Sequence, residues 1–109
     1  MAGSTNEKKS RWTFLTNHSH VLLCLAKNPS MRMRDIAVEV GVTERAVQRI
    51  VAELTEGGFI DCERVGRCNH YRICMDQRLR HPLEAHCRVT DLIGLIYGDA
   101  DSGTSSASE

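Results

Sequence analysis

Two arginines and a glutamine lie close together near the middle of the chain, at spacings that a helix brings to one side: Arg45, Gln48 and Arg49. A guanidinium can donate two parallel hydrogen bonds to the edge of guanine, and a primary amide can pair with adenine. Each good pair contributes about 1–3 kcal/mol of discrimination. Thr43 and Glu44 come just before them, and Glu44 also suits the positive end of a helix dipole. These residue types favour contacts with base edges or flanking phosphates.

A second polar cluster surrounds a glycine turn further along the chain. It comprises Arg64, Arg67, Asn69 and Arg72, with Gly66 at the turn. Such side chains on a protruding turn can approach the phosphate backbone or the minor groove of a duplex. The sequence thus predicts two contact regions, a helix over about 43–56 and a wing over about 64–72.

The cysteines offer thiol or metal chemistry, but they are odd in number and form no CxxC pair, which argues against disulfides and a zinc ribbon. They are Cys24, Cys62, Cys68, Cys74 and Cys87, and we expect free thiols. Cys62, Cys68 and Cys74 recur around His70 but do not converge on the hairpin register given below. A ligand, metal or redox response remains an alternative, including a site at His81, His86 and Cys87.

Catalytic chemistry finds little support in the sequence. Cys24 with His18 and His20 comes nearest to a nucleophile and base, but Cys24 belongs to a core-facing helical stripe. No glycine-rich nucleotide loop is present. We expect no enzyme activity, no cofactor and no metal ion.

Two helices joined by a tight turn must position the first cluster. One begins near Arg34, and Gly41 supplies the left-handed residue that commonly ends a helix. Thr43 suits the N-cap of the next helix, and Val42 in the turn fills the angle between the two. The apolar stripe of the second helix consists of Val47, Ile50, Val51 and Leu54. The pattern predicts a helix-turn-helix.

The outward face of this second helix changes sign along its length. Arg45 and Arg49 lie in the first two turns, whereas Glu53 and Glu56 lie near the C-terminal end, with Ala52 between them. Only the N-terminal half therefore suits a phosphate-lined major groove.

Gly57 and Gly58 end that helix, and the next segment predicts a hairpin around Gly66 and Arg67. Its expected cross-strand pairs are Val65 with Cys68, Arg64 with Asn69, Cys62 with Tyr71, and Ile60 with Ile73. Ile60, Cys62, Tyr71 and Ile73 would then share the core side. Glu63, His70 and Arg72 would lie on the other face.

Elements on either side complete the domain. We expect a helix between Phe14 and Lys27, a brief strand over Met31–Met33, and a C-terminal helix that begins near Val89 with Thr90 as its cap and ends near Tyr97. The fold class is mainly α with a small β-hairpin wing (α+β): a winged helix-turn-helix with flanking N- and C-terminal helices.

Length and charge agree with one domain over residues 12–97, between a disordered arm (1–11) and a disordered acidic, Ser-rich tail (98–109). The net charge is zero, yet residues 8–88 hold all 14 Lys and Arg against nine of the 14 acids, an excess of five positive charges. That balance is compatible with phosphate binding. No apolar segment follows the first lysines, so we expect no signal peptide and a cytoplasmic location.

The segment MRMRDIAVEVGVTERAVQRIVAELTEGGFIDCERVGRCNHYRI resembles the DNA-binding domain of MarR- and ArsR-type bacterial transcriptional regulators, especially a group of small ones. With FLTNHSHVLLCLAKNP before it and LRHPLEAHCRVTDLIGLI after it, the likeness covers about residues 12–97. It implies a major-groove recognition helix and a DNA-contacting wing. Cys68 departs from this pattern at a wing position that is often basic, and the paired cysteines of metal-sensing ArsR repressors are missing.

The terminal helices carry more apolar surface than a small winged domain can cover. The residues concerned are Trp12, Phe14, Leu92, Ile93, Ile96 and Tyr97. Pairing two copies would bury them, as the resemblance also implies, although they could instead close the monomer core. A two-fold dimer would place its recognition helices about one DNA turn apart.

We therefore predict a homodimeric, sequence-specific regulator that binds double-stranded DNA. The alternatives are a winged-helix adaptor that binds protein, or a regulator that responds to a ligand, metal or redox signal through its Cys and His residues.

Overall fold

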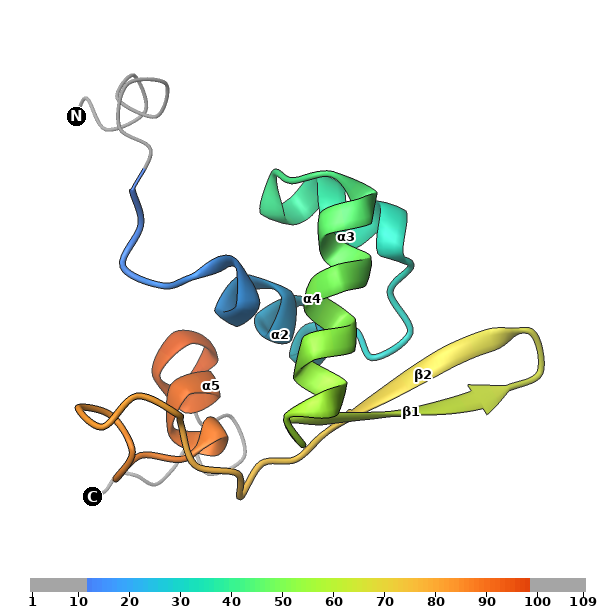
Figure 1. Cartoon of the computed structure of the whole chain (residues 1–109). Helices are drawn as coiled ribbons and strands as arrows, with labels where there is room; N and C mark the ends of the chain where they lie inside the picture. Colours follow the sequence, from blue (N-terminus) through green and yellow to red (C-terminus); the bar gives the residue numbers. More distant parts are fainter. Residues whose placement is uncertain (1–11, 99–109) are drawn as a thin grey trace.

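A computed structural model describes residues 12–98 of the chain. The element order is α2 (Asn17–Lys27), α3 (Met33–Val40), α4 (Glu44–Glu56), β1 (Ile60–Val65), β2 (Cys68–Ile73) and α5 (Val89–Tyr97). In Figure 1, α3 lies at the upper end of α4, the β1–β2 hairpin extends to one side from the lower end, and α5 lies at the lower left. The arm predicted over 1–11 and the tail beyond residue 98 lie outside the described residues.

The turn between α3 and α4 has the predicted chemistry. Gly41 adopts φ 87° at the end of α3, a left-handed conformation that a residue with a Cβ adopts only at a cost. The Thr43 hydroxyl accepts a hydrogen bond from the Ala46 N–H at 3.0 Å and so caps α4. Val42 is half-buried and packs against the core. The helix-turn-helix and both of its terminal signals are confirmed.

One apolar core holds the four described helices and the hairpin together. Its members are Val21, Leu22, Leu25, Ile36, Ala37, Val47, Ile50, Val51, Leu54, Phe59, Ile60, Tyr71 and Val89. Burying each large aliphatic side chain among them contributes about 1.5–3 kcal/mol relative to leaving it exposed. The predicted stripe of α4 is buried along its whole length, which fixes the opposite face of that helix toward solvent.

The hairpin has the predicted register, from Val65 opposite Cys68 to Ile60 opposite Ile73. Ile60 and Tyr71 are buried in the core. The expectation that Cys62 is a core residue was wrong: its side chain is exposed, because the hairpin runs out past the helices that would cover it (Figure 1).

The loop before α3 is tied to the hairpin by backbone rather than by a third strand. The Tyr71 N–H donates to the Pro29 carbonyl at 2.9 Å, and the Ser30 hydroxyl lies 3.2 Å from His70 Nδ1. The strand predicted over Met31–Met33 was wrong, since the sheet of the described residues has β1 and β2 alone and α3 already begins at Met33.

The first helix begins three residues later than the apolar pattern predicts. Thr16 is its N-cap, because the hydroxyl accepts a hydrogen bond from the Ser19 N–H at 3.3 Å. Phe14 therefore precedes the helix and packs edge-on against Trp12, with ring centroids 5.1 Å apart.

The link from β2 to α5 folds back on itself. The Leu79 N–H donates to the Cys87 carbonyl at 3.0 Å, and the Val89 N–H donates to the Gln77 carbonyl at 2.9 Å. The expected Thr90 cap was wrong. The Asp91 carboxylate accepts from the Arg88 N–H at 2.8 Å instead, since a side chain in the first turn can reach back to the residue before the helix.

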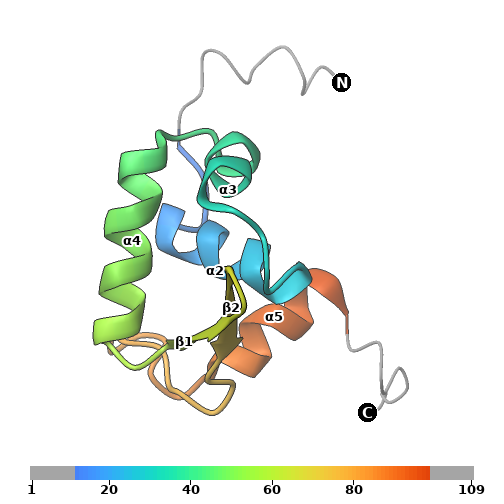
Figure 2. The ribbon, with the colours of Figure 1, turned by 90° about the vertical axis from the view of Figure 1, so that its right-hand side faces the viewer.

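Figure 2 shows the molecule after a quarter turn, with α4 along one side, α2 in the middle and α5 toward the opposite side. Together with the hairpin, this arrangement confirms the predicted fold class, an α+β winged helix-turn-helix with flanking helices. It leaves the polar side chains of the N-terminal half of α4 exposed to solvent.

Candidate nucleic-acid interface

The N-terminal half of α4 presents its polar side chains to solvent. Thr43, Glu44, Arg45, Gln48 and Arg49 are all exposed. Within residues 12–98 neither Arg45 nor Arg49 takes part in an ion pair. The free N–H groups and the positive dipole end of the helix lie at the same place. This end of α4 can therefore receive an anionic partner without first losing an internal contact.

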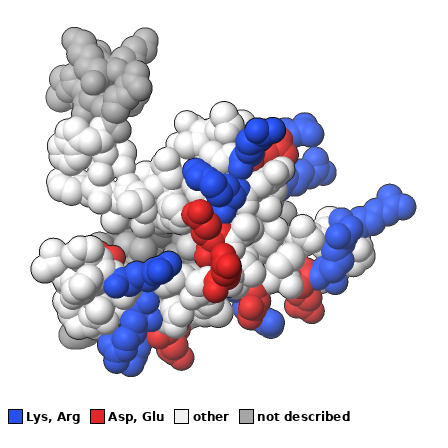
Figure 3. Space-filling view, in the orientation of Figure 1, with Lys and Arg blue, Asp and Glu red and all other residues white. Residues whose placement is uncertain are grey.

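The charge on α4 divides along the helix axis. Figure 3 shows Lys and Arg side chains over the upper part of α4 and at the wing, and acidic side chains over the lower part of α4. Glu53 and Glu56 belong to the lower part. A polyanion is thus attracted to the N-terminal half alone, where the predicted base-reading residues lie.

The wing brings together some of its predicted contact residues and separates others. Arg64 lies opposite Asn69, on the same face of the hairpin as Tyr71. The Asn69 amide lies 3.5 Å from the Tyr71 hydroxyl. Arg72 lies opposite Asp61 on the other face, beside an acid rather than among the remaining basic residues. All four predicted wing residues are exposed.

A cleft joins the N-terminus of α4 to the wing. It has a volume of about 470 Å³ and brings Glu44 of α4 together with Arg67 and Asn69 of the wing. Two residues that the sequence reasoning missed, Arg32 and Arg34, also line it. The alternating MRMR segment could have indicated these two contact residues. Because the segment was predicted to be a strand, its arginines were not expected at the start of α3.

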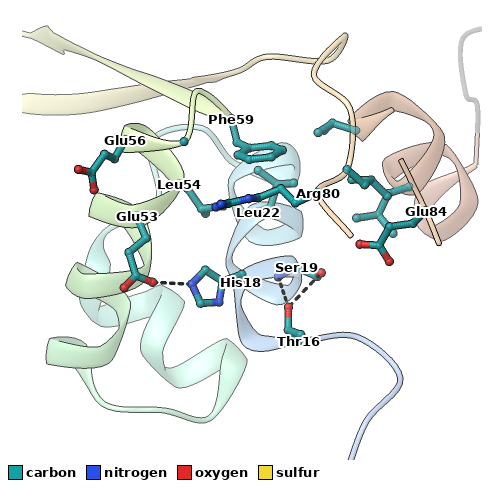
Figure 4. Close-up of a pocket in the computed structure, with 14 residues that line it drawn as sticks. Thr16, His18, Ser19, Leu22, Glu53, Leu54, Glu56, Phe59, Arg80 and Glu84 are labelled. Carbon is teal, nitrogen blue, oxygen red and sulfur yellow. Dashed lines mark hydrogen bonds and ion pairs between the residues drawn. The ribbon is translucent and has the colours of Figure 1, made fainter. Parts of the chain in front are cut away.

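A second, larger pocket lies beside the other half of α4, and no sequence pattern predicted it. Its volume is about 660 Å³, and residues of α2, the C-terminal part of α4 and the segment 79–92 line it (Figure 4). His18 Nε2 lies 2.7 Å from the Glu53 carboxylate at its edge. That hydrogen bond is the main cause that lowers the pKa of Glu53, with the charges of His18 and Arg49 acting in the same direction and desolvation opposing them.

The Cys and His residues lie only in part outside the two predicted contact regions. Over residues 12–98 no three His, Cys, Asp or Glu side chains are grouped so as to hold a metal ion, and all five cysteines are free. Burial, aided by the Glu39 carboxylate and opposed by Lys27, raises the pKa of the Cys24 thiol, which disfavours a reactive thiolate. His81 Nδ1 accepts a hydrogen bond from the Leu83 N–H at 3.1 Å.

The predicted dimerisation residues divide into two sets. Trp12 and Phe14 are 70% and 90% exposed, and Ile96 and Tyr97 are also exposed. Ile93 instead packs against the monomer core, and Leu92 lines the larger pocket. Leu95, which the sequence reasoning did not single out, is 78% exposed on α5.

Comparison with protein families places these observations in context. Residues 15–61 match a family model described as winged helix-turn-helix DNA-binding. The match includes α2, α3 and α4 and ends at the start of β1, so it covers the helix-turn-helix but neither the wing tip nor α5. It supports a role in DNA binding for the segment that carries Arg45 and Arg49. A search of curated proteins gave no match to this chain.

No helix among the described residues combines the length and the hydrophobicity needed to cross a bilayer.

Proposed function

We propose that this chain is a cytoplasmic, sequence-specific regulator of transcription, similar to MarR- and ArsR-type proteins, that binds double-stranded DNA. The N-terminal half of α4 would enter the major groove, and the wing would contact the flanking backbone or minor groove. The observation that carries the proposal is the exposed basic end of α4, which lies in a helix-turn-helix matching a DNA-binding family.

Within this interface the residues would divide their roles. Arg45, Gln48 and Arg49 project from the first two turns of α4, where guanidinium and amide groups can pair with guanine and adenine. Thr43 and Glu44 would lie at the mouth of the groove. Arg64, Arg67, Asn69 and Arg72 would hold the phosphates or the minor groove beside it. Because Arg72 lies on the other face of the hairpin, we expect it to contribute least.

The cleft between α4 and the wing would receive a phosphate strand. Arg32 and Arg34 at the start of α3 and Arg67 of the wing line it, with a single acid, Glu44, among them. A strand there would bridge the two contact regions. Phosphate contacts of this kind set the register of a protein on the duplex without reading sequence.

We also propose that two copies pair through α5 and the segment before α2. Leu95, Ile96 and Phe14 leave apolar area exposed there, and α5 lies toward the side of the molecule opposite α4 (Figure 2). A two-fold pair formed by this surface would leave both α4 helices outward, about one DNA turn apart on a pseudo-palindrome.

Selection from a random DNA pool tests sequence-specific binding. We expect an enriched sequence whose affinity falls steeply with salt, since each phosphate contact contributes about −0.9 to the slope of log K against log salt. Arg49→Ala should weaken binding to that sequence, and Arg80→Ala, an exposed arginine away from the interface, should not. No enrichment and no binding at low salt would favour the protein-binding adaptor.

Analytical ultracentrifugation tests the dimer. Leu95→Glu with Ile96→Glu should convert a dimer to a monomer, because the substitutions place charges in the proposed contact without entering the core. The matched control is Val65→Glu at the end of β1, which is 57% exposed and belongs to the hairpin that extends away from α5 in Figure 1. A wild-type chain that sediments as a monomer at every concentration tested would contradict the dimer.

A further inference from the structure

The larger pocket lies against the half of α4 that the proposed DNA contacts do not use. Its wall on one side is the C-terminal part of α4, with Glu53, Leu54 and Glu56, and its wall on the other is the segment that includes Arg80 and Glu84. Figure 4 shows these two walls facing each other, with α2 behind. At about 660 Å³ the pocket falls within the range of small-molecule sites.

The floor of this pocket is apolar. Leu22 of α2, Leu54 of α4 and Phe59 contribute to it, with Leu79, Val89 and Leu92 beside them. Most of these side chains also belong to the core or pack against it, so the floor is held in place by the rest of the domain. A fixed apolar floor favours a ligand with an apolar body, because such a ligand gains burial without reordering the protein.

The rim of the pocket is acidic overall. The three carboxylates of Glu53, Glu56 and Glu84 face one guanidinium, that of Arg80, and the imidazole of His18. His18 is already hydrogen-bonded to Glu53, and this bond lowers the pKa of Glu53 and so favours its charged form. Figure 4 shows Arg80 across the middle of the pocket, with Glu53 and Glu56 on one side and Glu84 on the other. The rim thus favours a cation that can approach the glutamates.

We propose that this pocket binds an organic cation with an apolar body, such as an arylalkylamine. The ammonium group would lie among the glutamates. The aromatic or aliphatic part would lie on Leu22, Leu54 and Phe59, where it would displace the exposed Arg80 side chain from the middle of the pocket. The acidic rim favours a cation over an anion. The apolar floor favours an organic cation over a simple inorganic ion.

Occupation of the pocket would also alter α4, and this part rests on the proposed function. An ammonium group that pairs with Glu53 competes with His18, whose hydrogen bond joins α2 to α4. Glu53 and the proposed base-reading residues lie on the same continuous helix, Glu44–Glu56. We expect bound amine to lower DNA affinity about threefold to tenfold, and DNA to lower amine affinity by the same factor, because coupling between two binding sites is reciprocal.

Binding can be measured without DNA, by NMR on the isotope-labelled full chain. The probe is 2-(1-naphthyl)ethylamine, and the matched ligands are 1-naphthylacetate and 2-(1-naphthyl)ethanol, which have the same ring system with an anionic or a neutral head. We expect the amine to shift the backbone signals of Leu22, Leu54 and Phe59 with a Kd of about 1 mM, as its size implies. The anion should bind about tenfold more weakly or not at all.

Variants at the rim test the charge argument in both directions. Glu56→Gln with Glu84→Gln should weaken amine binding about fivefold, and Arg80→Gln should strengthen it about twofold, since it removes a like charge. The matched control is Glu39→Gln, an exposed glutamate on α3 outside the pocket, which should leave the affinity unchanged. None of these side chains belongs to the core, so folding is expected to be preserved.

Four results would overturn the proposal. The first is equal or tighter binding of the naphthylacetate, with loss of that binding in Arg80→Gln. The second is that no ligand shifts the NMR signals of the pocket residues. The third is that these signals shift with protein concentration alone, and the fourth is that they shift when residues 2–11 are deleted rather than when amine is added. The third would assign the pocket to a second copy and the fourth to the N-terminal segment of the chain. DNA binding is measured separately. If the chain binds no DNA, the proposed coupling to DNA is wrong, but the NMR experiment still tests the amine site.

Discussion

The two halves of α4 share one buried stripe but present different surfaces to solvent. Toward the N-terminus the exposed face carries Arg45, Gln48 and Arg49, beside a cleft that continues to the wing. Toward the C-terminus it carries Glu53 and Glu56, beside a pocket with an apolar floor. One half is suited to a polyanion, and the other repels it.

This difference separates what folds the helix from what the helix does. Val47, Ile50, Val51 and Leu54 are buried in both halves alike, so burial along the stripe cannot distinguish the two functions. The distinction lies entirely in exposed side chains, which cost little to change. The same buried scaffold can therefore hold a contact surface at one end and a separate binding pocket at the other.

The largest expected effect on stability comes from truncating a side chain in the buried apolar stripe that both halves of α4 share. Ile50→Ala should lower the free energy of unfolding by about 2–5 kcal/mol, because Ile50 is 2% exposed and its removal leaves a cavity. Urea denaturation followed by circular dichroism measures the change. Ala52→Ser, on the exposed face of the same helix, is the control and should differ little from the wild type. An Ile50→Ala protein as stable as the wild type would contradict the single shared core.

A substitution confined to one half should affect one function alone. Arg45→Ala should weaken specific DNA binding by about 1–3 kcal/mol if its guanidinium contacts a base, without changing the melting temperature. Glu56→Gln in the other half should leave DNA affinity unchanged or raise it slightly, because it removes a negative charge. Fluorescence anisotropy with the selected duplex measures both. Equal losses in the two variants would mean that the halves are not distinct.

The cap of α4 should matter for stability where an equivalent threonine elsewhere does not. Thr43→Ala removes the hydroxyl that accepts from the Ala46 N–H and should cost about 1 kcal/mol. Thr90→Ala should be nearly neutral, since Asp91 accepts the terminal bond of α5. Thermal unfolding of the two variants provides the comparison, and a similar cost at both positions would argue against the assigned caps.

The smallest expected effect concerns pH at the C-terminal half. The His18 hydrogen bond lowers the pKa of Glu53 below its ordinary value of 4.5. The stability contributed by this carboxylate is therefore present above pH 4.5 and is lost as the pH falls through its lower folded-state pKa. Glu53→Gln should remove that acid-dependent part, whereas Glu56→Gln retains the hydrogen bond and should keep it. NMR titration of the Glu53 side-chain carbon checks the direction, and a pKa at or above 4.5 would contradict it.

Sequence patterns predicted the parts of this fold that local chemistry determines. Gly41 and Thr43 mark a turn whose geometry depends on a few adjacent residues, and both assignments were confirmed. The hairpin register followed from a two-residue turn, since fixing the turn fixes every pair beyond it. The outward direction of Arg45 and Arg49 followed from the buried stripe on the opposite face.

The assignments that failed depend on contacts between distant residues or on a competing local bond. The Met31–Met33 segment alternates like a strand, but no strand within residues 12–98 pairs with it, and Met33 is the first residue of α3. Cys62 lies on the core face of β1 but beyond the edge of the core, a distance that alternation does not encode. The larger pocket combines α2, α4 and residues 79–92, so no single stretch of sequence carries its signature.

The bond from the Tyr71 N–H to the Pro29 carbonyl bears on how freely the wing can move. It anchors the base of the hairpin to the loop that leads into α3, while the tip at Gly66 extends away from the helices (Figure 1). The base of the hairpin is therefore already restrained against rotation before DNA binds. Only the last few residues of the tip remain to adjust to the duplex. The fold itself therefore sets the distance between the N-terminal half of α4 and the wing. That distance limits the groove widths that this protein can contact with both regions at once.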